Sequence, residues 1–114
     1  LVRGYVNLPL STKTSSTNAT GLQLGALSST QTLYAFVHVT AVSGTTPDLD
    51  IVIESDSSNA FSTPITQLTL SNCNSVGSYT SSLTGANTDT WYRAKLTIAG
   101  TSPSFTALIA LAVV

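Results

Sequence analysis

The sequence predicts an all-β fold: an antiparallel, jelly-roll-like β-sandwich of about eight strands. Apolar and polar residues alternate with a period of two along most of the chain, and no stretch shows the 3.6-residue period of an amphipathic helix. Clusters of Gly, Pro, Asn and Ser interrupt the alternation at short intervals, where turns are expected. A Gly-Thr-x-Pro motif also occurs twice, at 44–47 and 100–103, between long β-rich segments.

Eight segments qualify as strands because each combines this alternation with turn-forming residues at its ends. In chain order they are 2–8, 21–24, 32–42, 49–55, 65–70, 78–83, 90–98 and 105–113. A polar Ser/Thr/Asn loop is expected over 11–20. With 114 residues the chain has material for a single core, so we expect one domain. Within it, residues 1–20 form an N-terminal strand with a polar arm or loop, and residues 21–114 form the sandwich.

The two Gly-Thr-x-Pro motifs are predicted to be the turns of two similar hairpins, 56 positions apart. Glycine permits unusual backbone angles, and proline cannot donate to a strand ladder, so both residues suit a turn. Pairing inside each hairpin then defines the core faces. The facing pairs are Val42 with Leu49, Thr40 with Ile51, His38 with Ile53, Ile98 with Phe105, Leu96 with Ala107 and Ala94 with Ile109. Two such hairpins are what a sandwich of two Greek keys requires.

The opposite faces of these hairpins carry apolar and charged residues together, which indicates that they are covered. On the first hairpin they are Leu33, Ala35, Val37, Val39, Asp48, Asp50, Val52, Glu54 and Asp56. On the second they are Trp91, Arg93, Lys95, Thr97, Leu108, Ala110 and Ala112. We therefore expect self-association or docking onto a larger assembly. The candidate interface residues are Val37, Val39, Asp50, Glu54, Trp91, Arg93, Lys95, Leu108 and Ala110. The acidic residues of the first hairpin form a row: Asp48, Asp50, Glu54 and Asp56. This acidic row and the Arg93/Lys95 pair are expected to be able to meet across a subunit boundary.

Charge excludes several classes of partner. Only 8% of residues are charged, the formal net charge is -1, and serine and threonine make up about a third of the chain. The four cationic residues are too scattered to neutralise a row of phosphates or to form a polybasic membrane patch, so neither nucleic acid nor membrane is an expected partner. The longest apolar stretch, 107–114, is too short to span a bilayer. The single cysteine, Cys73, excludes an intrachain disulfide and fits a reducing compartment.

The residues that could support chemistry each have a simpler interpretation. The acidic row could bind calcium or act as a carboxylate pair, but a flat row does not converge, so an edge facing solvent or a partner is favoured. His38 is expected to be a hydrogen-bonded core residue, and Cys73 to be inert. Trp91 and Tyr92 point to opposite sides of a strand, so one of them belongs to the core. No catalytic, cofactor-binding or metal-ligating residue is expected, and the chain is not predicted to be an enzyme.

Three segments carry a resemblance to a known family: 36–56, 88–93 and 100–105. Together they resemble small virion structural proteins of tailed bacteriophages, of the head decoration (cement) type, over about two-thirds of the chain, chiefly from Leu33 onward. The resemblance implies a β-sandwich, trimeric and bound to the capsid surface, that clamps neighbouring major capsid subunits. It also implies synthesis in the cytoplasm of the host bacterium. Residues 1–20 would then be a docking arm.

A head decoration protein that stabilises a phage capsid is therefore the function that we expect. A tail or shell subunit is a close alternative within the structural class. A carbohydrate-binding or tail-fibre module is the alternative from another class, and it requires exposed aromatic residues on one sheet face or loop. Six of the nine charged side chains fall on the predicted outer faces, so charge marks the expected interface: Asp48, Asp50, Glu54, Asp56, Arg93 and Lys95.

Overall fold

The computed structural model describes residues 3–114, and it is built from strands and loops. The strands are β1 (Arg3–Lys13), β2 (Thr17–Asn18), β3 (Leu22–Gln23), β4 (Thr32–Asp56), β5 (Ile65–Leu70), β6 (Gly77–Thr84) and β7 (Trp91–Val113). Leu1 and Val2, which the sequence places in the first strand, lie outside the described residues. The predicted all-β fold is confirmed, and β5 has the predicted bounds.

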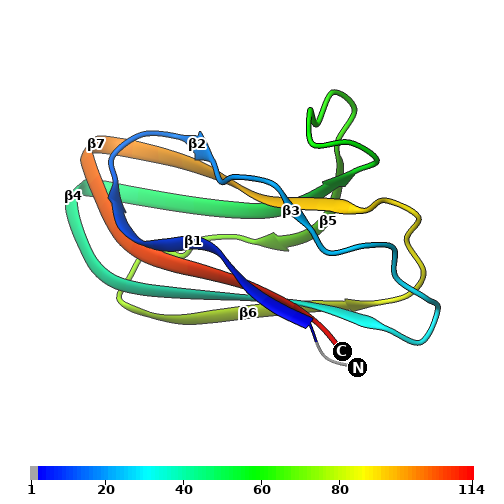
Figure 1. Ribbon diagram of the computed structural model, residues 1–114. Coiled ribbons are helices and arrows are strands. Elements are labelled where there is room, and N and C mark those ends of the chain that lie inside the picture. The colour runs from blue at the N-terminus through cyan, green and yellow to red at the C-terminus, as the bar shows by residue number, and fades with distance from the viewer. Residues whose placement is uncertain (1–2) are drawn as a thin grey trace.

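Two long strands, β4 and β7, organise the molecule. They pair antiparallel along their whole length, from Leu33 opposite Val113 to Asp56 opposite Trp91. Halfway along, both strands bend together, so that one seven-stranded sheet folds into two facing layers (Figure 1). The first layer has the order β1-β7-β4-β6 and uses the C-terminal half of β7 and the N-terminal half of β4. The second layer holds their other halves, with β5 beside β4 and the short β2 and β3 beside β7.

The Gly-Thr-x-Pro motifs lie at the bend, and the prediction that each is a hairpin turn is wrong. Leu49 of β4 pairs with Ile98 of β7, and Val42 of β4 pairs with Phe105 of β7. The segments before and after each motif therefore pair with segments that flank the other motif, and not with each other. Gly44 and Gly100 both have positive φ angles, 112° and 115°. A Cβ atom on Gly44 would lie 2.6 Å from the carbonyl oxygen of Ser102, and one on Gly100 would lie 2.6 Å from that of Thr46. The two motifs therefore pack against each other reciprocally at the corner.

The core lies between the two layers and is almost entirely aliphatic. The first layer contributes Leu33, Ala35, Val37, Val39, Phe105, Ala107, Ile109, Leu111 and Val113, and the second contributes Leu49, Ile51, Ile53, Leu68, Leu70, Tyr92, Ala94 and Leu96. Each Val, Leu or Ile in this set stabilises the fold by about 1.5–3 kcal/mol through burial. Five of the six predicted core residues of β7 are confirmed, and the sixth, Ile98, is half-buried against the core. The predicted core residues that follow the bend in β4 are confirmed.

Before the bend, the predicted faces of β4 are inverted. Val37 and Val39 are 0% and 2% exposed, so they belong to the core and not to an outer face, whereas His38 is exposed. The cause is a shift in strand register between Val39 and Ala41. This shift changes which alternate residues of β4 point inward. If strict alternation is continued from Val42 toward the N-terminus, it therefore assigns the even-numbered residues to the core, whereas the odd-numbered residues from 33 to 39 are buried.

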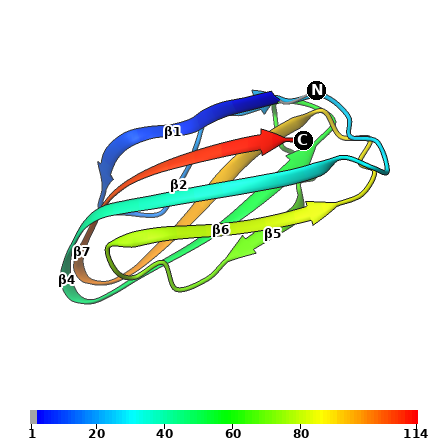
Figure 2. The ribbon, with the colours of Figure 1, turned by 90° about the horizontal axis from the view of Figure 1, so that it is seen from below.

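The N-terminal segment belongs to the sandwich. β1 pairs with β7 in the first layer from Arg3 to Lys13, and β2 pairs with β7 in the second layer. The predicted loop over 11–20 is therefore shorter than expected, and residues 3–18 do not extend away from the body as an arm. Figure 2 shows the first layer with β1 along one edge and β6 along the other.

Candidate functional site

The nine predicted interface residues divide between three places. Val37 and Val39 are in the core and are not available to a partner. Leu108 and Ala110 are half-buried on the outer side of the first layer. The other five lie on the outer side of the second layer, at the opposite side of the sandwich: Asp50, Glu54, Trp91, Arg93 and Lys95. The structure thus separates the apolar candidates from the charged ones.

The outer side of the first layer forms what we call the aromatic face: Tyr34, Phe36, Leu108, Ala110 and Ala112. Tyr34 lies opposite Ala112 and Phe36 opposite Ala110, so each ring of β4 stands beside a small side chain of β7. The two rings are parallel within 9°, with their centroids 6.0 Å apart. All five side chains are half-buried while their neighbours in sequence are core residues. A sheet with a complete core on one side thus carries an apolar surface on the other.

Polar groups border the aromatic face along β6. Ser78, Thr80 and Ser82 pair with His38, Phe36 and Tyr34, and all three hydroxyl-bearing residues are exposed. The imidazole Nδ1 of His38 lies 2.8 Å from the hydroxyl oxygen of Ser78. His38 therefore makes the expected hydrogen bond, but at the surface beside an apolar patch, because its strand presents the opposite face from the one predicted.

Two of the charged candidates, Glu54 and Arg93, meet within one chain. Glu54 and Arg93 are register partners on β4 and β7, and the Arg93 Nε donates to a Glu54 carboxylate oxygen at 2.6 Å. The Arg93 guanidinium carbon also lies 4.2 Å from the centroid of the Phe61 ring. Phe61 is buried and belongs to the loop between β4 and β5. The ion pair and the cation–π contact therefore hold this loop against the second layer.

Two other acidic residues of β4, Asp50 and Asp56, accept hydrogen bonds from backbone groups of loops. An Asp50 carboxylate oxygen accepts from the Asn72 N–H at 2.8 Å. Asp56 accepts from the backbone N–H groups of Thr63 and Ser57, at 3.0 and 2.6 Å. The Thr63 bond is the main cause of an Asp56 pKa below the usual value. Each carboxylate thus orients a loop, and within residues 3–114 no group of three or more His, Cys, Asp or Glu residues is placed to hold a metal ion.

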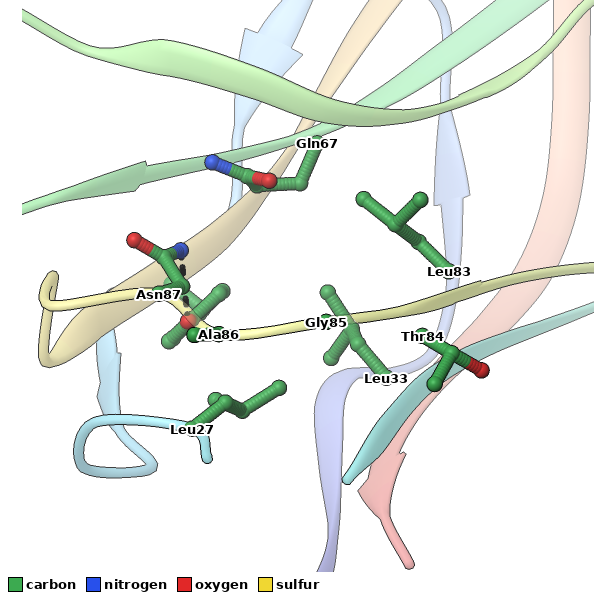
Figure 3. Close-up of a pocket in the computed structure, with 9 residues that line it drawn as sticks. Leu27, Leu33, Gln67, Leu83, Thr84, Gly85, Ala86 and Asn87 are labelled. Carbon is green, nitrogen blue, oxygen red and sulfur yellow. Dashed lines mark hydrogen bonds between the residues drawn. The ribbon is translucent and has the colours of Figure 1, made fainter. Parts of the chain in front are cut away.

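A small cavity opens between the layers at the end opposite the bend (Figure 3). Its volume is about 110 Å³, and it is lined by Leu27, Leu33, Gln67, Leu83, Thr84, Gly85, Ala86, Asn87 and Tyr92. Pockets for drug-sized molecules start at about 300 Å³, so this one has room only for a few water molecules.

A hydrogen-bond network that sequence reasoning missed lies beside the cavity. The Ser55 hydroxyl donates to Asp89 at 2.8 Å and accepts from the side-chain amides of Gln67 and Asn87. The Asn87 amide also donates to the Tyr92 hydroxyl at 2.8 Å. Burial raises the pKa of Tyr92 to about 12. These contacts secure the loop between β6 and β7. No short sequence motif could have revealed them, since the residues come from three separate segments: β4, β5 and 87–92.

Two further expectations from the sequence are confirmed, one for the Trp91–Tyr92 pair and one for Cys73 in the loop before β6. Tyr92 is 0% exposed while Trp91 is half-buried on the outer side, so one aromatic residue of the pair is in the core. Cys73 is 0% exposed, and burial raises the pKa of its thiol to about 11. A thiol with this pKa is unreactive at neutral pH, which agrees with an inert cysteine.

The comparisons with known proteins bear on the fold. No model of a known protein family matches the chain, and no curated protein matches it in sequence. A chain in the structure of infectious bursal disease virus Gx strain superimposes with a TM-score of 0.54 at 12% identity, over 99% of this chain and 31% of that chain. A family 16 carbohydrate binding module-2 gives a TM-score of 0.48 at 16% identity, over 84% of this chain and 70% of that one.

At these identities the likeness to the viral chain shows the fold alone, which is a jelly-roll-like β-sandwich. This chain spans about a third of the length of that viral chain. Among residues 3–114 there is no helix of the length and apolarity needed to cross a membrane.

Proposed function

We propose that this chain is a structural virion protein, a head decoration protein that binds the outside of a phage capsid through its aromatic face. The observation that carries the proposal is the aromatic face itself: Tyr34, Phe36, Leu108, Ala110 and Ala112 form an apolar outer surface on a layer whose inner side is already core. Apolar surface of this kind on a small protein marks a contact with another macromolecule. The sequence resemblance to phage decoration proteins and a fold shared with a chain of a virus particle support this choice of partner.

The face also has the composition of a protein–protein contact. Its centre holds aromatic and small aliphatic side chains and no charge, and its border along β6 holds hydroxyl groups. Interfaces are enriched in aromatic residues and depleted in charged residues at their centre, with a polar rim. Docking would remove Tyr34 and Phe36 from water without removing a charge, which avoids the main desolvation cost of association.

The test is co-sedimentation with expanded capsids of the phage that carries the gene, using two matched variants of β7. Ala110→Lys places a charge at the centre of the aromatic face, and Ala99→Lys places the same charge on the outer side of the second layer. We expect Ala110→Lys to weaken capsid binding at least tenfold, which corresponds to about 1.4 kcal/mol, and Ala99→Lys to bind like the native chain. Equal binding by both variants would contradict docking through this face.

A carbohydrate-binding role is a second candidate, and one specific observation favours it. The parallel rings of Tyr34 and Phe36 lie beside the hydroxyl groups of Ser78, Thr80 and Ser82, which is the combination of stacking surface and hydrogen-bonding groups that a sugar requires. A glycan array separates the two roles. Specific glycan binding that Tyr34→Ala abolishes, without any binding to capsids, would replace the decoration role with this one.

A further inference from the structure

The four lateral edges of the two layers differ in how they are protected against pairing with another strand. An open edge leaves a row of backbone N–H and C=O groups unpaired, and proteins block such edges with prolines, bulges, charges or very short strands. β1 has Pro9, register shifts on both sides of Leu8, and a cation at each end, Arg3 and Lys13. In the second layer, β2 and β3 have two residues each, and β5 follows Pro64 and pairs across a register shift. Three edges are thus blocked.

The fourth edge, β6, has none of these features. Its eight residues, Gly77–Thr84, pair with β4 in unbroken register from Val39 opposite Gly77 to Thr32 opposite Thr84. It contains no proline and no charged residue, and six of its eight residues are exposed. Within residues 3–114, β4 is the strand with which β6 pairs, and β5 of the second layer lies near β6 without pairing with it. The other side of β6 therefore has no hydrogen-bonded strand partner and is an open edge (Figure 2).

We infer that β6 is a self-association edge, where a second copy of this chain adds its own β6 antiparallel about a two-fold axis, so that the chain forms a dimer in place of the trimer that the sequence resemblance implies. A two-fold axis between identical strands brings like residues together, so any charge near the centre of the strand would repel its own copy. β6 has no charge to repel. An antiparallel pairing also requires residues from the same side of the strand to face each other, and β6 satisfies this in a register centred on Ser81.

In that register Thr80 faces Ser82 of the second copy and Ser78 faces Thr84, so hydroxyl groups lie opposite hydroxyl groups on the outer side. On the inner side Tyr79 faces Leu83 of the second copy, and this contact would cover a leucine that is 45% exposed in the single chain. The first layers of the two copies then form one sheet in the order β1-β7-β4-β6-β6-β4-β7-β1. The two aromatic faces become one continuous surface, although the inference does not depend on what that surface binds.

The test is the mass of the protein in solution, measured by sedimentation equilibrium for the native chain and two matched variants. Thr80→Lys and Thr69→Lys make the same change at exposed threonines on β6 and β5, neither of which makes a side-chain hydrogen bond. We expect the native chain and Thr69→Lys to have twice the mass of 11.8 kDa, and Thr80→Lys to dissociate at least tenfold more readily because two lysines meet near the axis. Thermal melting confirms that each variant is folded.

A cysteine cross-link tests the register without adding charge. Ser81→Cys places two thiols directly opposite each other across the axis, about 4.5–5.5 Å apart between Cβ atoms, which a disulfide can bridge. Mild oxidation should therefore give a cross-linked dimer for Ser81→Cys and none for Thr69→Cys, while the native Cys73 is buried and does not interfere. A monomeric or trimeric native chain, a Thr80→Lys variant that dimerises like the native chain, or the absence of the Ser81→Cys cross-link would each overturn the inference.

Discussion

At the scale of single residues, Gly44 and Gly100 control the bend that folds the sheet. Both have φ angles that side chains other than glycine rarely adopt, and both approach the backbone of the other motif closely. Gly44→Ala or Gly100→Ala should therefore destabilise the fold by about 2–4 kcal/mol, from backbone strain and from the clash with a carbonyl oxygen. Chemical denaturation measures the loss.

Gly4→Ala is the matched control for these substitutions. It lies in β1 with its would-be Cβ in ordinary contact, 3.7 Å from the Cβ of Ala112, and its φ is not positive. We expect a change of less than about 0.5 kcal/mol. If Gly44→Ala were no more destabilising than Gly4→Ala, the reciprocal packing of the two motifs would not be a determinant of the bend.

Cys73 gives a second prediction at this scale. Because burial raises its pKa to about 11, a thiolate fraction of only about one in a thousand is expected at pH 8, and the side chain is also inaccessible. A thiol reagent should react with the native chain very slowly and with one equivalent after denaturation. Val76→Cys, at a position that is 64% exposed in the same loop, should react at once. Rapid reaction of the native chain would show that the loop does not cover Cys73.

The aromatic face could have been identified from the sequence by comparing the two sides of one strand. Residues 33, 35, 37 and 39 are all aliphatic, whereas the alternate set includes Tyr34, Phe36 and His38. The uniformly aliphatic set is the better candidate for a core, since a buried histidine needs a partner. The assumed hairpin outweighed this signal and assigned the wrong side to the core, so Leu108 and Ala110 were identified as surface residues but their aromatic neighbours were not.

At the scale of the elements, alternation and turn residues located the strands but not their partners. β5 and β6 agree with prediction within about one residue at each end, because both depend on local alternation between turns. The pairing of β4 with β7 joins segments 35 to 80 positions apart, such as Asp56 with Trp91 and Leu33 with Val113, and no local pattern encodes it. A tight hairpin is the usual interpretation of a Gly-x-x-Pro segment, and only the close fit of one motif against the other makes it a corner.

The loop between β4 and β5 is held by the contacts of Arg93, which gives a prediction for this element. Glu54 is a buried residue, 5% exposed. Arg93→Leu would leave its carboxylate without its partner. We expect a loss of about 2–3 kcal/mol, more than for an exposed ion pair, since Glu54 is removed from water. A double-mutant cycle with Glu54→Gln should give a coupling energy of about 1–2 kcal/mol. A coupling near zero would mean that the ion pair does not hold the loop.

At the scale of the whole molecule, the sandwich separates its surfaces by chemistry. The outer side of the second layer carries the ion pair and the carboxylates that orient loops, while the outer side of the first layer carries the aromatic face. The scarcity of charge thus has two sources. Several charged side chains serve the fold of this chain, and one whole outer surface has an apolar centre. The first layer is where we propose that a partner is bound.

The orientation of the protein on a capsid tests the central claim most directly. Electron cryomicroscopy of capsids incubated with the native chain should show the sandwich on the outer shell surface, with the β1-β7-β4-β6 layer toward the capsid and Tyr34, Phe36 and Leu108 within the contact. Density bound through the second layer, or capsids that remain bare at concentrations well above those of the co-sedimentation experiment, would contradict the account.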